Sequence, residues 1–304
     1  MSKSLSLKSK DTEEWLDIYF NRPVGLCIAL ICRRLGVPPN TVTVTSIIFG
    51  IAAAVMFCHH DLAHNLCGVF CLMTANFCDS ADGQLARLTE QKTLLGRVLD
   101  GVAGDVWFIC IYAALSLRMM PQRIPFSAEH WGYTIWLLAY VAGLLCHARQ
   151  SSLSDYYRQI HLFFLFNKGN DELNNSRQVR EVYDSLPRKA WLVRLFYVFY
   201  EDYCISQEMR TPHFQLFFRQ YQEYKKNTDT TSIRDFFLDG SRPLMPFTNI
   251  LTFNTRAICL YITCLMDQPW IYFVFEILVL TPLYIFMKRK HEGLCVRCTA
   301  RMNG

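Results

Sequence analysis

Six stretches of mostly apolar residues, separated by polar segments, organise the chain. A helix needs about 20 apolar residues to cross the ~30 Å hydrocarbon layer of a bilayer. Because each stretch approaches that length, the pattern predicts an all-α integral membrane protein with six transmembrane helices. The six predicted helices are Val42–Cys58, Leu62–Cys78, Val98–Leu117, Trp131–Cys146, Met245–Met266 and Trp270–Met287.

The chain before the first predicted span, residues 1–41, has the pattern of a cytosolic N-terminus with an interfacial helix. Apolar residues that include Trp15 and Tyr19 fall on one side of a helix over residues 11–36. Its apolar part reaches Arg33 before it is long enough to cross a bilayer. This amphipathic helix is therefore predicted to lie in the membrane surface.

The predicted spans divide the rest of the chain into membrane and cytosolic parts. Residues 42–146 hold helices one to four, and residues 245–287 hold helices five and six. Between them, residues 147–244 form a cytosolic insert, in which aromatic residues at i, i+3 and i+4 spacing predict helices. Residues 288–304 are predicted to form a cytosolic tail.

Lysine and arginine concentrate on one side of the predicted helices. Even without the long insert, the loops and termini on that side hold 14 of these residues, whereas the opposite loops hold two, Arg118 and Arg123. Positive residues accumulate on the cytosolic side of a membrane. Both termini are therefore predicted to be cytosolic, and a bacterial inner (cytoplasmic) membrane is the expected location.

The composition agrees with a chain that has both membrane and water-exposed regions, because 52% of its residues are hydrophobic and 19% are charged. The net charge is only +5, and no local basic surface stands out, so no nucleic-acid partner is expected. Most of the 13 cysteines lie in apolar stretches, which favours buried free thiols over a disulfide scaffold. The one CxxC pair, Cys295 and Cys298, lacks a second pair to complete a zinc site and is interpreted as two free thiols.

An acidic motif marks the cytosolic end of the second predicted helix. On a helix with about 100° per residue, Asp79, Asp82, Gly83, Ala86 and Arg87 fall on one face that is about 140° wide. Gly83 and Ala86 are small enough to let a ligand approach the backbone. The motif therefore predicts a ligand site on this face.

The start of the third predicted helix adds Gly96, Asp100 and Asp105 at a similar depth. Four carboxylates at one level repel one another unless cations neutralise them. Oxygen ligands favour hard divalent cations. We therefore predict that Asp79, Asp82, Asp100 and Asp105 bind Mg²⁺ or Mn²⁺, in a two-metal site that would clamp a pyrophosphate.

This motif resembles the signature of the CDP-alcohol phosphatidyltransferases, a family of membrane phospholipid synthases. The family pattern is Asp, two residues, Asp-Gly, two residues, Ala-Arg, eight residues, Gly, three residues, Asp, three residues, Asp. Seven positions over 22 residues match it in identity and spacing: Asp79, Asp82, Gly83, Ala86, Arg87, Gly96 and Asp100.

The resemblance implies a reaction in which an alcohol hydroxyl attacks the phosphate of a CDP-linked donor and CMP leaves. It implies that Gly83, Ala86, Arg87 and Gly96 bind the cytidine nucleotide, and that the fourth aspartate of the pattern is the general base. It also implies a homodimer, although no interface residue can be named from the sequence.

One position departs from the family pattern. Gly104 stands where the fourth aspartate is expected, and Asp105 follows it. On a regular helix Asp105 lies about 140° from Asp100, so either it points elsewhere or one extra residue forms a π-bulge near Gly101 and Gly104. An unpaired aspartate facing lipid is costly. We therefore favour the bulge, with Asp105 as the base.

The predicted function is transfer of a phosphatidyl or similar lipid-phosphate group from a CDP-linked lipid, such as CDP-diacylglycerol, to a small polar alcohol. Arg149 and Arg256 are predicted to bind the acceptor, which favours inositol phosphate or glycerol phosphate, with inositol as a further option; Arg256 is equally placed to pair with Glu276. The alternative is transfer of phosphoethanolamine or phosphocholine from a CDP-alcohol to a diacylglycerol-like lipid. A cation-dependent transporter is disfavoured, because the aspartates crowd one level instead of following a path across the bilayer.

Overall fold

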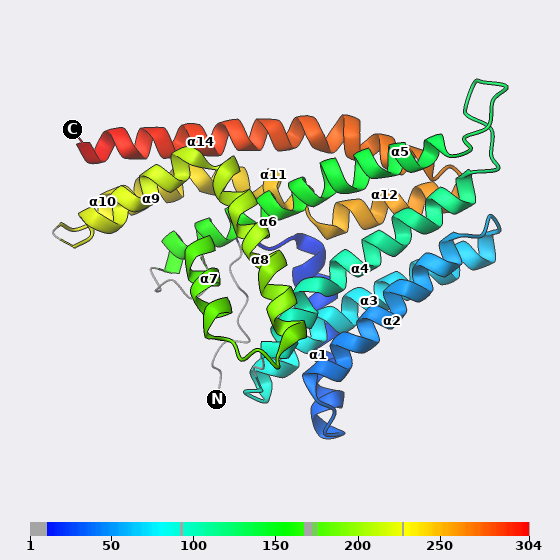
Figure 1. The fold of residues 1–304 in the computed structure, drawn as a ribbon, viewed down its shortest axis with the longest axis horizontal. Coiled ribbons are helices and arrows are strands. Elements are labelled where there is room, and N and C mark those ends of the chain that lie inside the picture. The colour runs from blue at the N-terminus through cyan, green and yellow to red at the C-terminus, as the bar shows by residue number, and fades with distance from the viewer. Residues whose placement is uncertain (1–10, 92–93, 167–172, 174, 227, 304) are drawn as a thin grey trace. The chain divides into compact units, whose positions relative to one another are not determined.

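The protein is helical in the part of the chain that the computed structural model describes, residues 11–91, 94–166, 173, 175–226 and 228–303 (Figure 1). Helices account for 83% of the structure, and its described residues form no named strand. These observations confirm the all-α prediction. The chain divides into two compact units: unit 1 comprises residues 1–14, 149–252 and 280–304, and unit 2 comprises residues 15–148 and 253–279.

Unit 2 contains the acidic motif. Its helix α2 lies along both α3 and α4. A Cβ atom added to Gly50 of α2 would overlap the indole ring of Trp107 in α4, so only glycine lets these two helices approach so closely. The segments of unit 2 are η1 (Asp17–Asn21), α1 (Arg22–Arg34), α2 (Pro39–Phe57), α3 (Leu62–Leu88), α4 (Leu94–Met119), α5 (Thr134–Tyr140), η2 (Val141–His147), α12 (Phe253–Leu265), α13 (Trp270–Phe275) and η4 (Glu276–Leu280).

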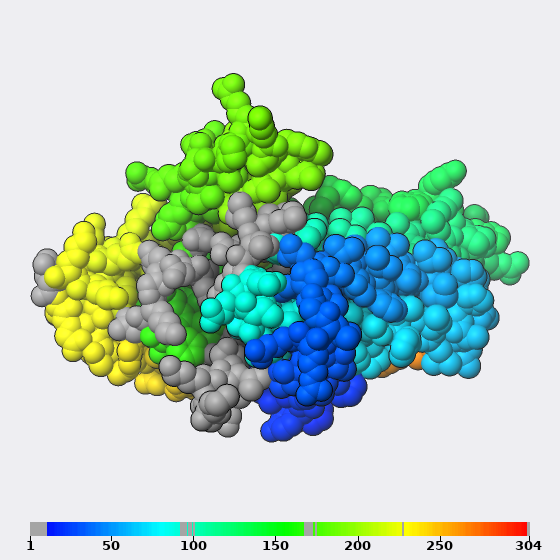
Figure 2. Space-filling model, turned by 90° about the horizontal axis from the view of Figure 1, so that it is seen from below, coloured from blue at the N-terminus to red at the C-terminus, as the bar shows by residue number. Residues whose placement is uncertain are grey.

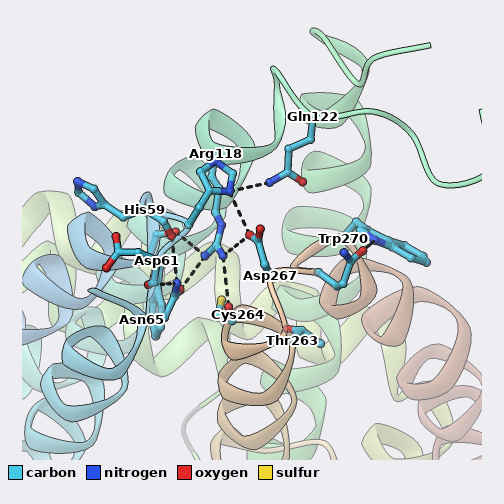
Figure 3. A network of polar contacts seen from close by, with 12 residues as sticks. His59, Asp61, Asn65, Arg118, Gln122, Thr263, Cys264, Asp267 and Trp270 are labelled. Carbon is cyan, nitrogen blue, oxygen red and sulfur yellow. Dashed lines mark hydrogen bonds and ion pairs between the residues drawn. The ribbon is translucent and has the colours of Figure 1, made fainter. Parts of the chain in front are cut away.

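A buried arginine ties four of these helical segments together (Figure 3). Arg118, in the last turn of α4, is 2% exposed and donates from Nη1 to the Phe57 carbonyl (3.0 Å) and to Asn65 Oδ1 (2.8 Å). Its Nη2 donates to the Cys264 carbonyl (3.2 Å) and to Asp267 Oδ1 (2.7 Å). The sequence pattern had assigned Arg118 to the loop after the third predicted span, whereas it belongs to the last turn of α4 and its side chain joins α2, α3 and α12 to α4.

Unit 1 has an aromatic core. Phe164 of α6 packs against Phe217 and Tyr221 of α9 and against Phe237 of α10, with ring centroids 4.3–5.7 Å apart. The aromatic spacing in this region had predicted helices, and the structure confirms them. The segments of unit 1 are α6 (Ala148–Phe166), α7 (Ser176–Ser185), α8 (Trp191–Arg210), α9 (Pro212–Tyr224), α10 (Thr231–Ser241), η3 (Arg242–Leu244), α11 (Met245–Ile250) and α14 (Thr281–Asn303).

Three helices in the described residues are long and apolar enough to cross a membrane: Pro39–Phe57, Gly101–Met119 and Trp270–Met302. They correspond to the first, third and sixth predicted spans and support the prediction of a membrane protein. The second predicted span lies within α3, which continues as one helix through the acidic motif to Leu88. The fourth is divided between α5 and η2. The number of six spans stays a prediction.

The fifth predicted span, Met245–Met266, is not one continuous helix. It is broken at Leu251 and Thr252, between α11 and α12. The Thr252 hydroxyl donates to the Asn249 carbonyl (2.6 Å), a local side-chain bond that competes with helical hydrogen bonding. The predicted tail from residue 288 is helical, because α14 continues to Asn303 without interruption, and its cytosolic location stays a prediction.

The predicted interfacial helix corresponds to η1 and α1. Its Trp15 and Tyr19 are exposed, with 69% and 66% of their surface accessible. Figure 2 shows this segment, in dark to medium blue, at the surface. Exposed aromatic rings beside a short amphipathic helix are typical of a segment in the membrane interface.

Candidate active site

The acidic motif occupies the last three turns of α3. On its apolar side, Cys78, Ala81 and Leu85 are buried against Ala29 of α1 and Val42 of α2. With about 100° per residue, Asp79, Gly83 and Arg87 point away from this side, whereas Asp82 lies at its edge. Packing of the apolar side therefore fixes the direction in which the motif faces.

Asp79 and Asp82 differ in burial in the way that this geometry requires. Asp82 is 4% exposed, whereas Asp79 is half-buried. Asp82 lies about 60° closer than Asp79 to the apolar side of the helix, which explains its deeper position. The predicted carboxylate pair is thus on one face of one helix, with one member deeply buried.

Helix α1 supports the motif from a second side. A Cβ atom added to Gly25 would lie 2.7 Å from the Ser80 hydroxyl, so the two helices are in direct contact there. The Gln84 side chain donates from Nε2 to the Arg22 carbonyl at 3.1 Å. These contacts fix the rotation of α3 about its own axis, and with it the direction of the carboxylates.

Two of the predicted nucleotide-binding residues lie side by side. A Cβ atom added to Gly83 would lie 3.7 Å from Nη1 of Arg87, so the guanidinium group lies beside the bare backbone of Gly83. Arg87 is exposed, and Ala86 is half-buried. This end of α3 therefore presents a cation beside a small-residue surface, a combination that suits a phosphate group.

Helix α4 is α-helical throughout, from Leu94 to Met119. The predicted π-bulge near Gly101 and Gly104 is therefore wrong. Ala103 and Trp107 are buried, whereas Asp105 is exposed together with Ile109, which is 68% exposed. The regular helix thus turns Asp105 onto the exposed side of α4, the other alternative that the sequence had left open.

The four predicted aspartates are not all brought together. A possible metal site has three or more potential ligands whose ligand atoms all lie within 4.8 Å of one another. Within the described part of the chain, Asp79, Asp82 and Asp105 belong to no such group. The side chain of Asp100 lies outside the described set, and Gly96, also in α4, is half-buried. The roles of these residues as metal ligands stay predictions.

The donor set on α3 fits a hard divalent cation. Its two described donors are carboxylates spaced i, i+3 on one face, and the residues beside them, Gly83 and Ala86, leave room for the phosphates of a substrate. Mg²⁺ and Mn²⁺ prefer such oxygen ligands and typically share their coordination with substrate phosphates. Asp79 and Asp82 would therefore be the first ligands of such an ion.

Comparison with known protein families decides the class. Residues 37–161 match the family described as CDP-alcohol phosphatidyltransferase. This chain carries a CDP-alcohol phosphatidyltransferase domain. Members of this family are membrane transferases of phospholipid biosynthesis, which move a phosphatidyl group from a CDP-alcohol donor to an alcohol acceptor and generally use divalent metal ions. No curated protein and no solved structure matches the chain.

A second polar group lies inside unit 2 and includes the phosphatidyltransferase domain's His147. Arg256 of α12 is 1% exposed and its Nη1 donates to Glu276 Oε2 at 2.5 Å. The same Nη1 lies 3.1 Å from Nδ1 of His147, which in turn is 3.4 Å from Glu276 Oε1. The predicted pairing of Arg256 with Glu276 is confirmed.

Two tyrosines complete this buried group, and sequence reasoning missed them. The Tyr112 hydroxyl donates to the Tyr272 hydroxyl at 3.4 Å and lies 3.5 Å from His147 Nδ1. Both tyrosines belong to apolar stretches, where the pattern predicts that an aromatic residue is part of the hydrophobic core. Arg149, the other predicted acceptor-binding residue, is exposed near the start of α6 in unit 1.

Proposed function

We propose that this protein transfers a phosphatidyl group from a CDP-linked lipid, such as CDP-diacylglycerol, to a small polar alcohol and releases CMP. The observation that carries the proposal is the motif face of α3, where the carboxylates of Asp79 and Asp82 lie beside the Gly83 surface and the Arg87 guanidinium group. Carboxylates and a cation with a small-residue surface between them suit a metal-bound pyrophosphate.

In this reaction the acceptor hydroxyl oxygen forms a bond to the lipid-side phosphorus, and the bond from that phosphorus to the CMP oxygen breaks. The divalent ions, when bound, would stabilise the negative charge that develops on the leaving phosphate. Asp79, Asp82 and Asp100 are the proposed ligands of these ions. Arg87 is proposed to hold the nucleotide phosphate, with Gly83, Ala86 and Gly96 leaving space for the cytidine nucleotide.

The proton of the acceptor hydroxyl requires a base. Asp105 was the predicted base and fourth metal ligand, and both roles stay predictions. The regular geometry of α4 favours the alternative in which Asp105 points away from the metal site. Substitution of Asp105 therefore tests the assignment directly.

The acceptor is proposed to be a small alcohol with an anionic group, of which inositol phosphate and glycerol phosphate are the favoured candidates, followed by inositol. The proposal rests on Arg149, an exposed cation, and on Arg256. Because Glu276 already holds Arg256, contact with an acceptor phosphate requires this guanidinium group to be shared between two anions.

The proposed setting is a homodimer with six membrane spans, with the acidic motif and both termini in the cytosol of a bacterial cell. The excess of Lys and Arg on one side of the apolar stretches supports this orientation. The division into residues 1–41, 42–146, 147–244, 245–287 and 288–304 is likewise proposed as the membrane organisation.

Release of CMP by detergent-purified protein tests the proposal. Each assay would contain Mn²⁺ and CDP-diacylglycerol with one acceptor: inositol phosphate, glycerol phosphate, inositol, ethanolamine or no acceptor. We expect CMP release that depends on one acceptor and is absent from the Asp82→Asn variant. A parallel assay with CDP-ethanolamine or CDP-choline and diacylglycerol tests the alternative in which the headgroup is donated. Absence of CMP in all of these assays would overturn the transferase proposal.

A further inference from the structure

A second set of potential metal ligands lies in unit 1, on the side of α14 that faces its core. His291, Glu292 and Cys295 each offer a ligand atom, and all these atoms lie within 4.8 Å of one another. The three side chains are 1%, 7% and 0% exposed. On a helix, these positions fall within an arc of about 100°, so one turn of α14 brings an imidazole, a carboxylate and a thiol together.

Two polar atoms of this set have no hydrogen-bond partner among the described residues, although both are buried: Nε2 of His291 and Oε1 of Glu292. A buried polar atom without a partner costs about 1–3 kcal/mol. The other carboxylate oxygen of Glu292 accepts a hydrogen bond from the His213 backbone N–H at the start of α9 (2.8 Å). Capping of α9 by Glu292 therefore accounts for only one of its two carboxylate oxygens.

The positions of these side chains are fixed by their neighbours. The His291 ring stacks on Tyr157 of α6, with centroids 3.9 Å apart and an angle of 20° between the planes. Its Nδ1 lies 3.8 Å from Sγ of Cys295. Two ligands at a tetrahedral angle on one zinc ion, with Zn–N and Zn–S bonds of about 2.0 and 2.3 Å, are about 3.5 Å apart. The observed separation of 3.8 Å between Nδ1 and Sγ is close to this value.

We propose that His291, Glu292 and Cys295 bind one Zn²⁺ ion in unit 1. Nitrogen and sulfur ligands favour zinc over Mg²⁺ or Mn²⁺. One thiolate and one carboxylate neutralise a dipositive ion, which makes the complex compatible with an apolar core. All three ligands lie on α14, and the proposal does not depend on the transferase function.

The test is the metal content of the full-length protein. The chain is produced in zinc-supplemented cells, freed of any affinity tag, dialysed against metal-free buffer and analysed by plasma mass spectrometry. We expect about one zinc ion per chain for the wild type and for Cys204→Ser, a matched control in which an equally buried thiol of unit 1 is replaced. Zinc should fall at least tenfold in Cys295→Ser and in Glu292→Gln.

Two further measurements keep the result unambiguous if a variant folds poorly. Cobalt-loaded wild-type protein should show a thiolate-to-cobalt charge-transfer band that Cys295→Ser lacks, and Asp82→Asn should keep its zinc while losing CMP release. Less than about one zinc ion per ten chains in the wild type, with no cobalt–thiolate band, would overturn the proposal. Full zinc retention by both Cys295→Ser and Glu292→Gln would overturn it as well.

Discussion

Nη2 of Arg118 lies 2.7 Å from Oδ1 of Asp267, and the same buried guanidinium group donates to two backbone carbonyls and to Asn65. Removing Arg118 leaves these acceptors without their donor at the point where several helices of unit 2 meet. Because the Asp267 side chain is 48% exposed, the main cost comes from the buried acceptors, and we expect Arg118→Ala to lower the free energy of unfolding by at least about 1–3 kcal/mol, the cost of leaving a buried polar group unpaired. Thermal unfolding in detergent measures this loss. Arg123→Ala, a neighbouring arginine outside the network, is the control and should change little.

The same ion pair predicts a pH dependence. Partial burial opposes the charge of Asp267, but hydrogen bonds and charge from Arg118 and His60 prevail and hold the pKa of its carboxyl below the usual range. A lowered folded-state pKa gives stability that is present above the unfolded-state pKa, about 3.9, and is lost as the pH falls below it. The melting temperature of the wild type should therefore drop below about pH 4 more steeply than that of Asp267→Asn. Parallel curves for the two proteins would contradict the assignment.

Replacement of two glycines of unit 2 by alanine is expected to change the stability of the protein in opposite directions. In Gly50→Ala the new Cβ would overlap Trp107, and overpacking of this kind costs about 1–3 kcal/mol. In Gly104→Ala the new Cβ meets no atom within 4 Å, and replacement of a helical glycine by alanine stabilises by up to about 1 kcal/mol. Melting temperatures of the two variants should therefore shift in opposite directions. A similar shift for both would contradict the close packing of α2 on α4.

The orientation of the acidic motif was predictable from sequence, whereas the surroundings of Arg118 were not. Burial along α3 follows the helical repeat, so spacing alone placed both carboxylates on one face with Gly83, Ala86 and Arg87. The partners of Arg118 are 53 residues away at Asn65 and 149 residues away at Asp267. Local periodicity carries no signal for such pairs, and an arginine at the end of an apolar stretch looks like a loop residue.

The failed predictions have physical reasons of the same kind. The mean hydropathy of a window that contains Leu251 and Thr252 stays high. It therefore does not reveal a helix break at which the Thr252 hydroxyl donates to a backbone carbonyl. The π-bulge in α4 rested on the cost of exposing Asp105, and the regular helix accepts that exposure. The proposed metal-ligand set in α14 has the sequence His-Glu-x-x-Cys, which differs from the paired CxxC pattern that is typical of structural zinc sites.

Variants of Arg256 distinguish a structural role of this residue from a role in acceptor binding. Arg256→Gln alone leaves Glu276 buried without its cation, and we expect a loss of about 3–5 kcal/mol in stability. Arg256→Gln with Glu276→Gln removes both charges and should recover most of this loss. If Arg256 binds an anionic acceptor, the double variant should fold normally and raise the acceptor KM about 10- to 100-fold, the value of a charge-assisted hydrogen bond. Measurement of KM for each acceptor decides this, and an unchanged KM would restrict Arg256 to a structural role.

Because α4 is a regular helix, we expect Asp82 and Asp105, at the two ends of the acidic motif, to differ in their importance for activity. Asp82 is buried on the motif face and should be required, so Asp82→Asn should lower CMP release by at least about 10²-fold, as expected when a group that stabilises the transition state is removed. Asp105 is exposed on the other side of α4, and the isosteric Asp105→Asn should keep turnover within about threefold of the wild type. Gly104→Asp places a carboxylate only about 40° from Asp100 and should preserve activity in the Asp105→Asn background. If Asp105→Asn were as inactive as Asp82→Asn while keeping the wild-type melting temperature, Asp105 would be the base.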